Sequence, residues 1–278
     1  MSTQRNEFEQ AAALIRSRIT TQPTVGLVLG SGLGGLADTL ADRVVIPYAH
    51  IPGWPQSTVQ GHSGQLVIGR FEDKVVAAQQ GRAHFYEGYT PQQVTFPIRV
   101  MQALGIDTVI LTNAAGGLNP NYRTGDLMLL NDHINFVGMS GNNPLMGPND
   151  DTLGPRFLGM VHTYDKSLRE SAKNVALEAG NTLHEGGYVF LFGPNFETPA
   201  ENRMLRAIGG DAVGMSTVHE VLVARHMGMR VLACSGITNE GIDTVDAEME
   251  TNHEEVLDAG KVMVPKLTTI LRGVIRSI

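Results

Sequence analysis

The residues best suited to chemistry lie in one stretch, from Gly193 to His226. Segment 198–201 reads T-P-x-E, a helix-capping box in which the Glu201 carboxylate accepts from a backbone N–H. Glu197 lies just outside this cap, beside Phe196, and has no capping role of its own. A carboxylate next to an aromatic ring can accept hydrogen bonds from a planar ligand that carries N–H groups. The ordinary alternative is a solvated loop glutamate.

The same stretch contains a predicted anion site. Residues 211–215 read as a short buried strand, and Ser216 and Thr217 follow as natural N-caps of a helix predicted over Val218–Met227. A helix N-terminus that offers a serine hydroxyl and backbone N–H groups without intrahelical partners can hold a small anion. The ordinary alternative for Ser216 is an N-cap and nothing more.

A second group of polar side chains follows a predicted hairpin, whose strands are 65–68 and 75–78. Arg82, His84 and Tyr86 alternate along the next segment, and in an extended chain this spacing places all three on one face. Arginine and histidine on one face suit a phosphate, against the alternative of an exposed polar strand edge. His62 precedes the hairpin and is either part of this site or a simple loop residue.

Glycines follow the first predicted strand, Val25–Leu29, as G-S-G-L-G-G, and are expected to open a helix that runs through Leu40. The spacing G-x-G-x-x-G after a strand is typical of dinucleotide sites. Such sites need an acidic residue roughly 20 positions later, where this chain has a proline-rich loop at 47–55. What remains is a backbone that can approach an anion, with the Ser31 hydroxyl beside it.

Two further predicted strands, Thr108–Leu111 and Arg230–Cys234, end in small and polar residues. Ligands of open α/β sheets bind at the carboxyl ends of strands. Ala114 follows the first of these strands and can offer its backbone N–H. Thr238 and Asn239 follow the second, and the Asn239 amide offers both an acceptor and donors, which suits a purine edge.

Composition excludes several classes of function. The chain has 278 residues, 42% of them hydrophobic, and a formal net charge of -7 without a basic cluster, which argues against nucleic-acid binding. No apolar run approaches the roughly 18 residues needed to span a bilayer, and the N-terminus lacks a signal-peptide pattern. We therefore expect a soluble, cytoplasmic protein. The single cysteine, Cys234, is expected to be buried, and no metal-binding motif is present.

Two other candidates stand outside these groups. The long loop 138–157 ends at Phe157, which either packs on the local core or reaches another molecule. His253 lies in the first turn of a helix that begins with the cap-like sequence N-x-x-E, and a surface histidine is its ordinary alternative.

Several segments together resemble a known family. GPNFET, GGDAVGMSTVHEVLVARH, VGLVLGSGLGGLAD, ITN and NHEEVLDAGK are similar to segments of the trimeric, low-molecular-mass class of purine nucleoside phosphorylases. They occur in the family's order over nearly the whole chain. The resemblance implies one α/β domain over residues 1–278, with a mixed central β-sheet flanked by helices. It also implies a homotrimer that needs no cofactor, with inorganic phosphate as co-substrate.

The resemblance also assigns roles to residues. The phosphate-binding residues would be Ser31, His62, Arg82, His84, the Ala114 N–H and Ser216. The residues that contact the nucleoside would be Tyr86, Phe196, Glu197, Val213, Met215, Thr238, Asn239 and His253, together with Phe157 of a neighbouring subunit. We assign catalytic roles to Asn239, Glu197 and His84. The chain departs from some family members at Ala83, where they have a bulkier residue, and at Glu240, where they have lysine, which concerns fine substrate preference.

The reaction implied is reversible phosphorolysis of inosine and guanosine, in purine salvage. Asn239 would bind purine N7 and Glu197 the N1–H, whereas the related methylthioadenosine phosphorylases have aspartate at the position of Asn239. A nucleoside hydrolase would not need the donors Arg82 and Ser31. A dinucleotide oxidoreductase depends on the glycine motif alone, and a non-catalytic nucleoside-binding protein is the third alternative.

Overall fold

The computed structural model describes residues 3–59, 61–248 and 253–278, and the side chains of Thr3, Gln4 and His253 lie outside the described part. The strands are β1 (Val25–Leu29), β2 (Ala41–Pro47), β3 (Gln65–Phe71), β4 (Lys74–Gln80), β5 (Thr108–Gly117), β6 (Leu127–Asn135), β7 (Leu183–Phe190), β8 (Ala212–Gly214) and β9 (Arg230–Glu240). The α-helices are α1 (Thr3–Arg18), α2 (Pro91–Ala103), α3 (Phe136–Met139), α4 (Lys166–Glu178), α5 (Pro199–Ala207), α6 (Val218–His226) and α7 (His253–Ser277). Short 3-10 helices are η1 (Gly34–Thr39), η2 (Tyr48–His50) and η3 (Phe85–Glu87).

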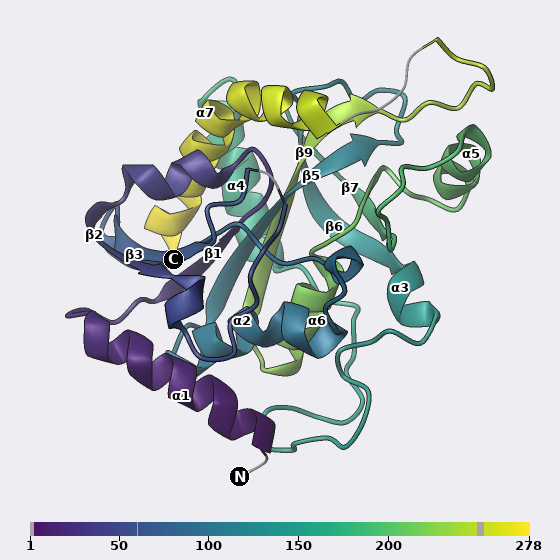
Figure 1. Ribbon diagram of the computed structural model, residues 1–278. Helices are drawn as coiled ribbons and strands as arrows, with labels where there is room; N and C mark the ends of the chain where they lie inside the picture. Colours follow the sequence, from purple (N-terminus) through teal and green to yellow (C-terminus); the bar gives the residue numbers. More distant parts are fainter. Residues whose placement is uncertain (1–2, 60, 249–252) are drawn as a thin grey trace.

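The strands form one mixed sheet in the order β2-β3-β4-β1-β5-β8-β7-β6-β9. β1 lies parallel to β4 and β5, whereas β3 is antiparallel to both of its neighbours. β9 pairs with β5 as well as with β6, so five of the strands close into a ring. The expected α/β fold with a mixed sheet is therefore confirmed (Figure 1).

Helices cover both faces of the sheet, because the central strands are apolar on both sides. In β1, Leu27 packs in the cluster that contains α4 and α7, whereas Val28 packs on the opposite side with α1, α2 and α6. Figure 1 shows α4 and α7 together on one side and α1, α2 and α6 on the other. Cys234 lies in the first of these clusters, which confirms that it is a buried apolar contact.

Most predicted elements are present, but one predicted helix is wrong and one strand was missed. The hairpin is formed by β3 and β4, and the Thr198 capping box begins α5. The helix expected from the glycine run through Leu40 does not form, because Gly32 has a φ of +73° and only Gly34–Thr39 is helical, as η1. β2 was not predicted, since it is a largely exposed edge strand whose apolar run is only the three residues Val44–Ile46.

The two strands β5 and β9 are longer than their apolar segments. They pair in parallel from Thr108 and Arg230 to Gly117 and Glu240, so the polar residues expected just after each strand are part of it. Ala115 pairs with Ile237 and Gly116 with Asn239, which leaves Thr238 as the extra residue of a bulge. Bulges re-aim side chains and often occur beside active sites, and this one lies at the carboxyl end of β9.

Within the described ranges, no helix is both long and apolar enough to cross a lipid bilayer.

The end of β1 gives a test of this packing. A Cβ added to Gly30 would lie 2.8 Å from the Thr112 carbonyl oxygen and 2.9 Å from the Asn113 Cα, both backbone atoms of β5. We expect Gly30→Ala to lower the free energy of unfolding by about 1–3 kcal/mol, as overpacking does. The control is Gly35→Ala, whose added Cβ meets no heavy atom within 4 Å and should change stability by less than about 0.5 kcal/mol. Urea denaturation measures both, and equal stabilities would contradict the prediction.

Candidate active site

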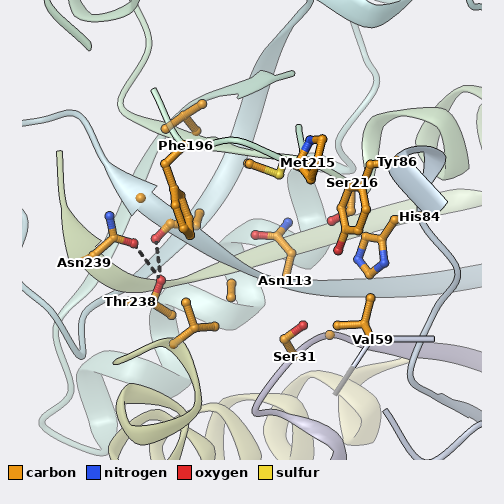
Figure 2. Close-up of a pocket in the computed structure, with 18 of the residues that line it drawn as sticks. Ser31, Val59, His84, Tyr86, Asn113, Phe196, Met215, Ser216, Thr238 and Asn239 are labelled. Carbon is orange, nitrogen blue, oxygen red and sulfur yellow. Dashed lines mark hydrogen bonds between the residues drawn. The ribbon is translucent and has the colours of Figure 1, made fainter. Parts of the chain in front are cut away.

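A cavity of about 330 Å³ opens at the carboxyl ends of β1, β5 and β9 (Figure 2). Most predicted site residues line this cavity, although they come from distant parts of the chain. They are Ser31, Arg82, His84, Tyr86, Ala114, Phe196, Glu197, Val213, Met215, Ser216, Thr238 and Asn239. Figure 2 shows Ser31, His84 and Ser216 toward one end and Phe196, Thr238 and Asn239 toward the other. We call these the anion end and the base end.

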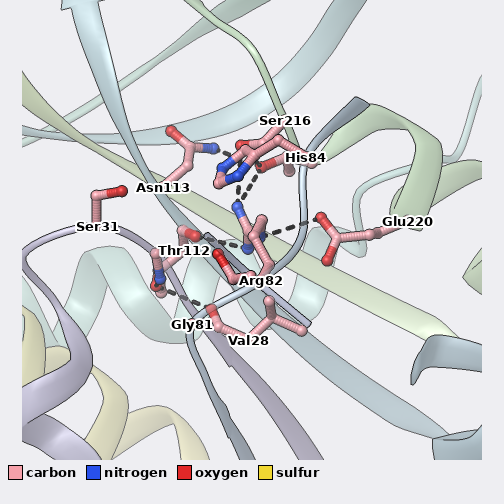
Figure 3. Close-up of polar contacts among 12 residues, drawn as sticks. Val28, Ser31, Gly81, Arg82, His84, Thr112, Asn113, Ser216 and Glu220 are labelled. Carbon is pink, nitrogen blue, oxygen red and sulfur yellow. Dashed lines mark hydrogen bonds and ion pairs between the residues drawn. The ribbon is translucent and has the colours of Figure 1, made fainter. Parts of the chain in front are cut away.

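Arg82 lies at the bottom of the anion end and is only 2% exposed. Its Nη1 donates to Ser216 Oγ at 3.0 Å and to Thr217 Oγ1 at 3.1 Å, and its Nη2 donates to the Thr112 carbonyl at 2.8 Å. Its Nε lies 3.4 Å from a carboxylate oxygen of Glu220, which is also buried. The guanidinium is therefore fixed on three sides by the protein (Figure 3).

The hydroxyl groups beside Arg82 are hydrogen-bonded to one another and to β5. Thr217 Oγ1 accepts from Arg82 and also from Asn113 Nδ2, at 2.9 Å. Ser216 Oγ lies 3.2 Å from Thr217 Oγ1 and also accepts from Arg82, so the two hydroxyls and the guanidinium contact one another.

The predicted N-cap roles are wrong in one respect. Thr217 stands at the N-cap of α6, but its hydroxyl makes no capping hydrogen bond, and its φ is +78°. Its hydroxyl instead serves Arg82 and Asn113. Ser216 precedes the cap and lines the cavity. The anion end thus depends on side-chain hydroxyls at the start of α6 as well as on its backbone.

His84 is held by a carboxylate that sequence reasoning did not single out. Its Nδ1 lies 3.0 Å from Glu87 Oε1, and Glu87 Oε2 accepts from the Thr58 hydroxyl at 2.6 Å. Burial alone would raise the pKa of Glu87, but the hydrogen bonds from His84 and Thr58 outweigh it and lower that pKa to about 2. An ionised Glu87 favours the His84 tautomer with its proton on Nδ1, which turns Nε2 away from Glu87.

Tyr86 reaches the cavity in a different way from the one predicted. It lies in η3 rather than in an extended strand, and its ring stacks on His84 at a centroid distance of 4.8 Å. The prediction that Arg82, His84 and Tyr86 share a face is confirmed, but a helical turn, not a period of two, places Tyr86 there.

His62 is not among the residues that line this cavity. Its Nε2 lies 3.0 Å from Ser31 Oγ, its Nδ1 lies 2.9 Å from the Arg82 carbonyl, and its ring stacks on His84. Burial, with the nearby charges of His84 and Arg82, lowers the pKa of His62 to about 4. His62 is therefore neutral at neutral pH and orients Ser31 from behind.

Glu197 and Phe196 occupy the base end, where no cation lies among the described lining residues. Burial is the largest influence on Glu197 and raises the pKa of its carboxyl group, and the charge of Glu201 acts in the same direction. The Phe196 ring is 42% exposed beside it. A half-buried carboxylate and an exposed ring at the mouth of a cavity suit a planar ligand with N–H groups.

Asn239 is oriented by the bulge. The Thr238 hydroxyl lies 3.0 Å from Asn239 Oδ1 and 3.3 Å from the Ala115 carbonyl, as the dashed lines in Figure 2 mark. The Asn239 amide thus turns its oxygen toward Thr238 and its Nδ2 to the other side. Gly116 lies opposite Asn239 and leaves space for its amide, since a Cβ added to Gly116 would lie 3.3 Å from Asn239 Nδ2.

Phe157 lies apart from this cavity, and His253 is located by its backbone alone. Phe157 is 90% exposed and borders a separate cavity of about 460 Å³, together with Met146, Met160 and Leu222. α7 begins at His253, but the His253 side chain lies outside the described part of the chain.

Sequence reasoning missed Glu220, Asn113 and Glu87. Glu220 lies among apolar residues in V-H-E-V-L-V-A, and an acid surrounded by valines on a helix predicts a buried carboxylate. This pattern could have identified Glu220 from the sequence. Asn113 and Glu87 carry no comparable pattern, because their roles depend on partners distant in the chain.

Residues 24–276 match the model of the phosphorylase superfamily. The chain is 49% identical to purine nucleoside phosphorylase 1 of Geobacillus stearothermophilus over 273 residues, which cover 98% of each chain. It is also similar to two crystal structures of Schistosoma mansoni purine nucleoside phosphorylase. The complex with adenosine has a TM-score of 0.94 at 42% identity, over 98% of this chain and 97% of that one. The complex with inosine has a TM-score of 0.93 at 41% identity, over 98% and 96%.

Proposed function

Because the chain belongs to the phosphorylase superfamily, among the purine nucleoside phosphorylases, we propose that it catalyses reversible phosphorolysis of 6-oxopurine nucleosides. The products are the free base and ribose or deoxyribose 1-phosphate. One observation carries the proposal: a single cavity joins a set of anion donors to a carboxylate and an amide suited to a purine. We assign the ribose to the space between the two ends, beside Tyr86 and Met215, which also line the cavity.

At the anion end, phosphate receives hydrogen bonds from Ser31 and Ser216, with the Arg82 guanidinium behind them. His84 Nε2 donates as well when the ring is protonated on both nitrogens, with its Nδ1–H held by Glu87. The Ala114 backbone N–H and His62, acting through Ser31, complete the predicted set. Donors fixed before binding hold phosphate in position to attack C1′, which converts an encounter of two molecules into a step within one complex. No cofactor takes part in this proposal.

At the base end, the C1′–N9 bond breaks as the C1′–O bond to phosphate forms, and the bonding electron pair passes to the purine ring. Asn239 Nδ2 donates to N7, where negative charge develops, and Glu197 accepts from N1–H. Hydrogen bonds that strengthen as charge develops lower the barrier. Phe196, Val213 and Thr238 line the same end of the cavity.

Asn239 gives the preference for 6-oxopurines. Its oxygen is directed toward Thr238, so it presents a donor to N7 and to a 6-oxo group rather than an acceptor to a 6-amino group. The Schistosoma mansoni relative has been crystallised with inosine and with adenosine. We take the reaction to serve purine salvage in the cytoplasm, in keeping with a chain whose described helices do not span a membrane.

The active assembly is proposed to be a homotrimer in which Phe157 closes the sugar site of a neighbouring subunit. Phe157 lies outside its own subunit's active-site cavity and is 90% exposed, and Met139, Met146 and Val161 nearby in the chain are exposed as well. Exposed apolar residues gathered in one segment suit an interface. His253 is assigned to the ribose 5′-hydroxyl by resemblance alone.

The first test is inosine turnover with and without phosphate. We expect hypoxanthine release only when phosphate is present, with ribose 1-phosphate as the second product, because the anion donors would otherwise have no role. Liquid chromatography of the reaction measures both products. Release without phosphate would indicate a hydrolase instead, and binding of inosine without turnover would indicate a non-catalytic protein.

Substrate preference tests Asn239. In Asn239→Asp, the side chain can accept from a 6-amino group but no longer donates to N7. We expect the ratio of kcat/KM for inosine to that for adenosine to fall by about 10- to 100-fold, since a mismatched buried hydrogen bond costs about 1–3 kcal/mol. Asn174→Asp, on the exposed surface of α4, is the matched control for the added charge. An unchanged ratio in Asn239→Asp would refute the assignment.

Subunit complementation tests Phe157. Phe157→Ala should lower kcat/KM for inosine by about 10-fold or more, the scale of a lost interface anchor. Coexpression with an Arg82→Ala subunit should restore activity, because some hybrid sites combine an intact Arg82 with an intact Phe157. Leu177→Ala, at a residue that is 79% exposed on α4, is the control. Full activity in a chain that sediments as a monomer would contradict the proposal.

A further inference from the structure

Glu220 is the buried carboxylate at the anion end that none of the proposed steps uses. It lies on α6 and is 1% exposed, and one of its oxygens is 3.4 Å from Arg82 Nε (Figure 3). Burial is the largest influence and raises the pKa of Glu220, and the Arg82 charge and a hydrogen bond from the Thr217 backbone N–H offset it only in part. The carboxylate thus contacts two groups that bear directly on the predicted phosphate site.

The first of these groups is Arg82. A guanidinium has five N–H donors. Two on Nη1 reach Ser216 and Thr217, one on Nη2 reaches the Thr112 carbonyl, and the one on Nε faces Glu220. Glu220 is therefore the charged partner on the Nε side of the guanidinium, whereas the partners of Nη1 and Nη2 are neutral oxygens.

The second group is the turn that carries Ser216. Thr217 has a φ of +78°, an uncommon value for a β-branched residue. Its N–H donates to Glu220, and its hydroxyl accepts from Arg82. One carboxylate therefore holds the backbone of this turn and the arginine that binds the two hydroxyls of the same turn.

We propose that Glu220 is a positioning residue for the phosphate co-substrate, acting through Arg82 and the Ser216–Thr217 turn; this rests on the function proposed above. A buried ion pair is weak evidence for stability, because the desolvation of two charges offsets their attraction. An apolar pair of similar volume would fill this interior as well. The carboxylate provides orientation instead, since it fixes the Arg82 guanidinium and the Ser216–Thr217 turn relative to each other.

Two substitutions separate charge from shape. Glu220→Gln keeps the size of the side chain and an acceptor for the Thr217 N–H, but it removes the charge that faces Arg82. Glu220→Asp keeps the charge and shortens the side chain. Glu170→Gln, at an exposed residue of α4 that pairs with Lys166 at 3.6 Å, is the control for the loss of an ion pair.

The measurement is steady-state phosphorolysis of inosine, with KM determined separately for phosphate and for inosine. We expect Glu220→Gln to raise the phosphate KM by about 10-fold or more, in line with the loss of a charge-assisted contact, while the inosine KM stays within about threefold. Glu220→Asp should recover part of the phosphate KM. The increase in Tm that phosphate gives the wild-type protein should shrink in Glu220→Gln.

The outcomes are distinct. If Glu220 only fills space, Glu220→Gln will behave as wild type and Glu220→Asp will be the poorer variant, which overturns the proposal. Equal increases in both KM values also overturn it. Should Glu220→Gln fail to fold, Glu220→Asp decides, because a selective rise in its phosphate KM is expected and its absence counts against the idea. Wild-type protein without phosphate-dependent turnover would refute the proposed function instead.

Discussion

A buried guanidinium is the constraint on which the candidate site depends. Arg82 follows β4 and has almost no exposure to solvent. A charge that is buried in this way has to be paired and hydrogen-bonded. Its partners are a strand carbonyl, two hydroxyls at the start of α6 and the Glu220 carboxylate. These partners come from two distant parts of the chain, so the position of Arg82 fixes β5 and α6 relative to the segment that follows β4.

The pairing of β5 with β9 sets the distance between the two ends of the cavity. β5 supplies Thr112 and Asn113 to the anion end and Gly116 near the base end, and β9 runs beside it over the same length. The register changes at Thr238, which turns Asn239 into the cavity. A ligand that contacts both ends therefore lies along the paired strands β5 and β9, whereas Glu197 and Phe196 reach it from a loop.

Local patterns in the sequence predicted the elements, most strand positions and ten residues that line the cavity. The capping box at Thr198 and the buried central strands depend on neighbours within a few residues, so their signals are local. The continuation of β5 and β9 through polar residues, the bulge at Thr238 and the positive φ of Thr217 depend on distant partners. Glu87 and Asn113 were missed for the same reason. The family resemblance, rather than residue spacing, supplied the roles of Val213, Met215 and Phe157.

The arginine at the anion end is paired with a carboxylate before any substrate binds. Arg82 is the only lysine or arginine among the described residues that line the cavity, and Glu220 faces it. His62 is neutral near pH 7 because burial lowers its pKa. A phosphate at this position would be held by directed hydrogen bonds from hydroxyl, imidazole and backbone groups more than by excess positive charge. Such contacts fix the orientation of the attacking oxygen, which is the quantity that proximity catalysis requires. They also explain how a chain with a formal net charge of -7 can bind an anion, because the donors act locally and need no basic surface.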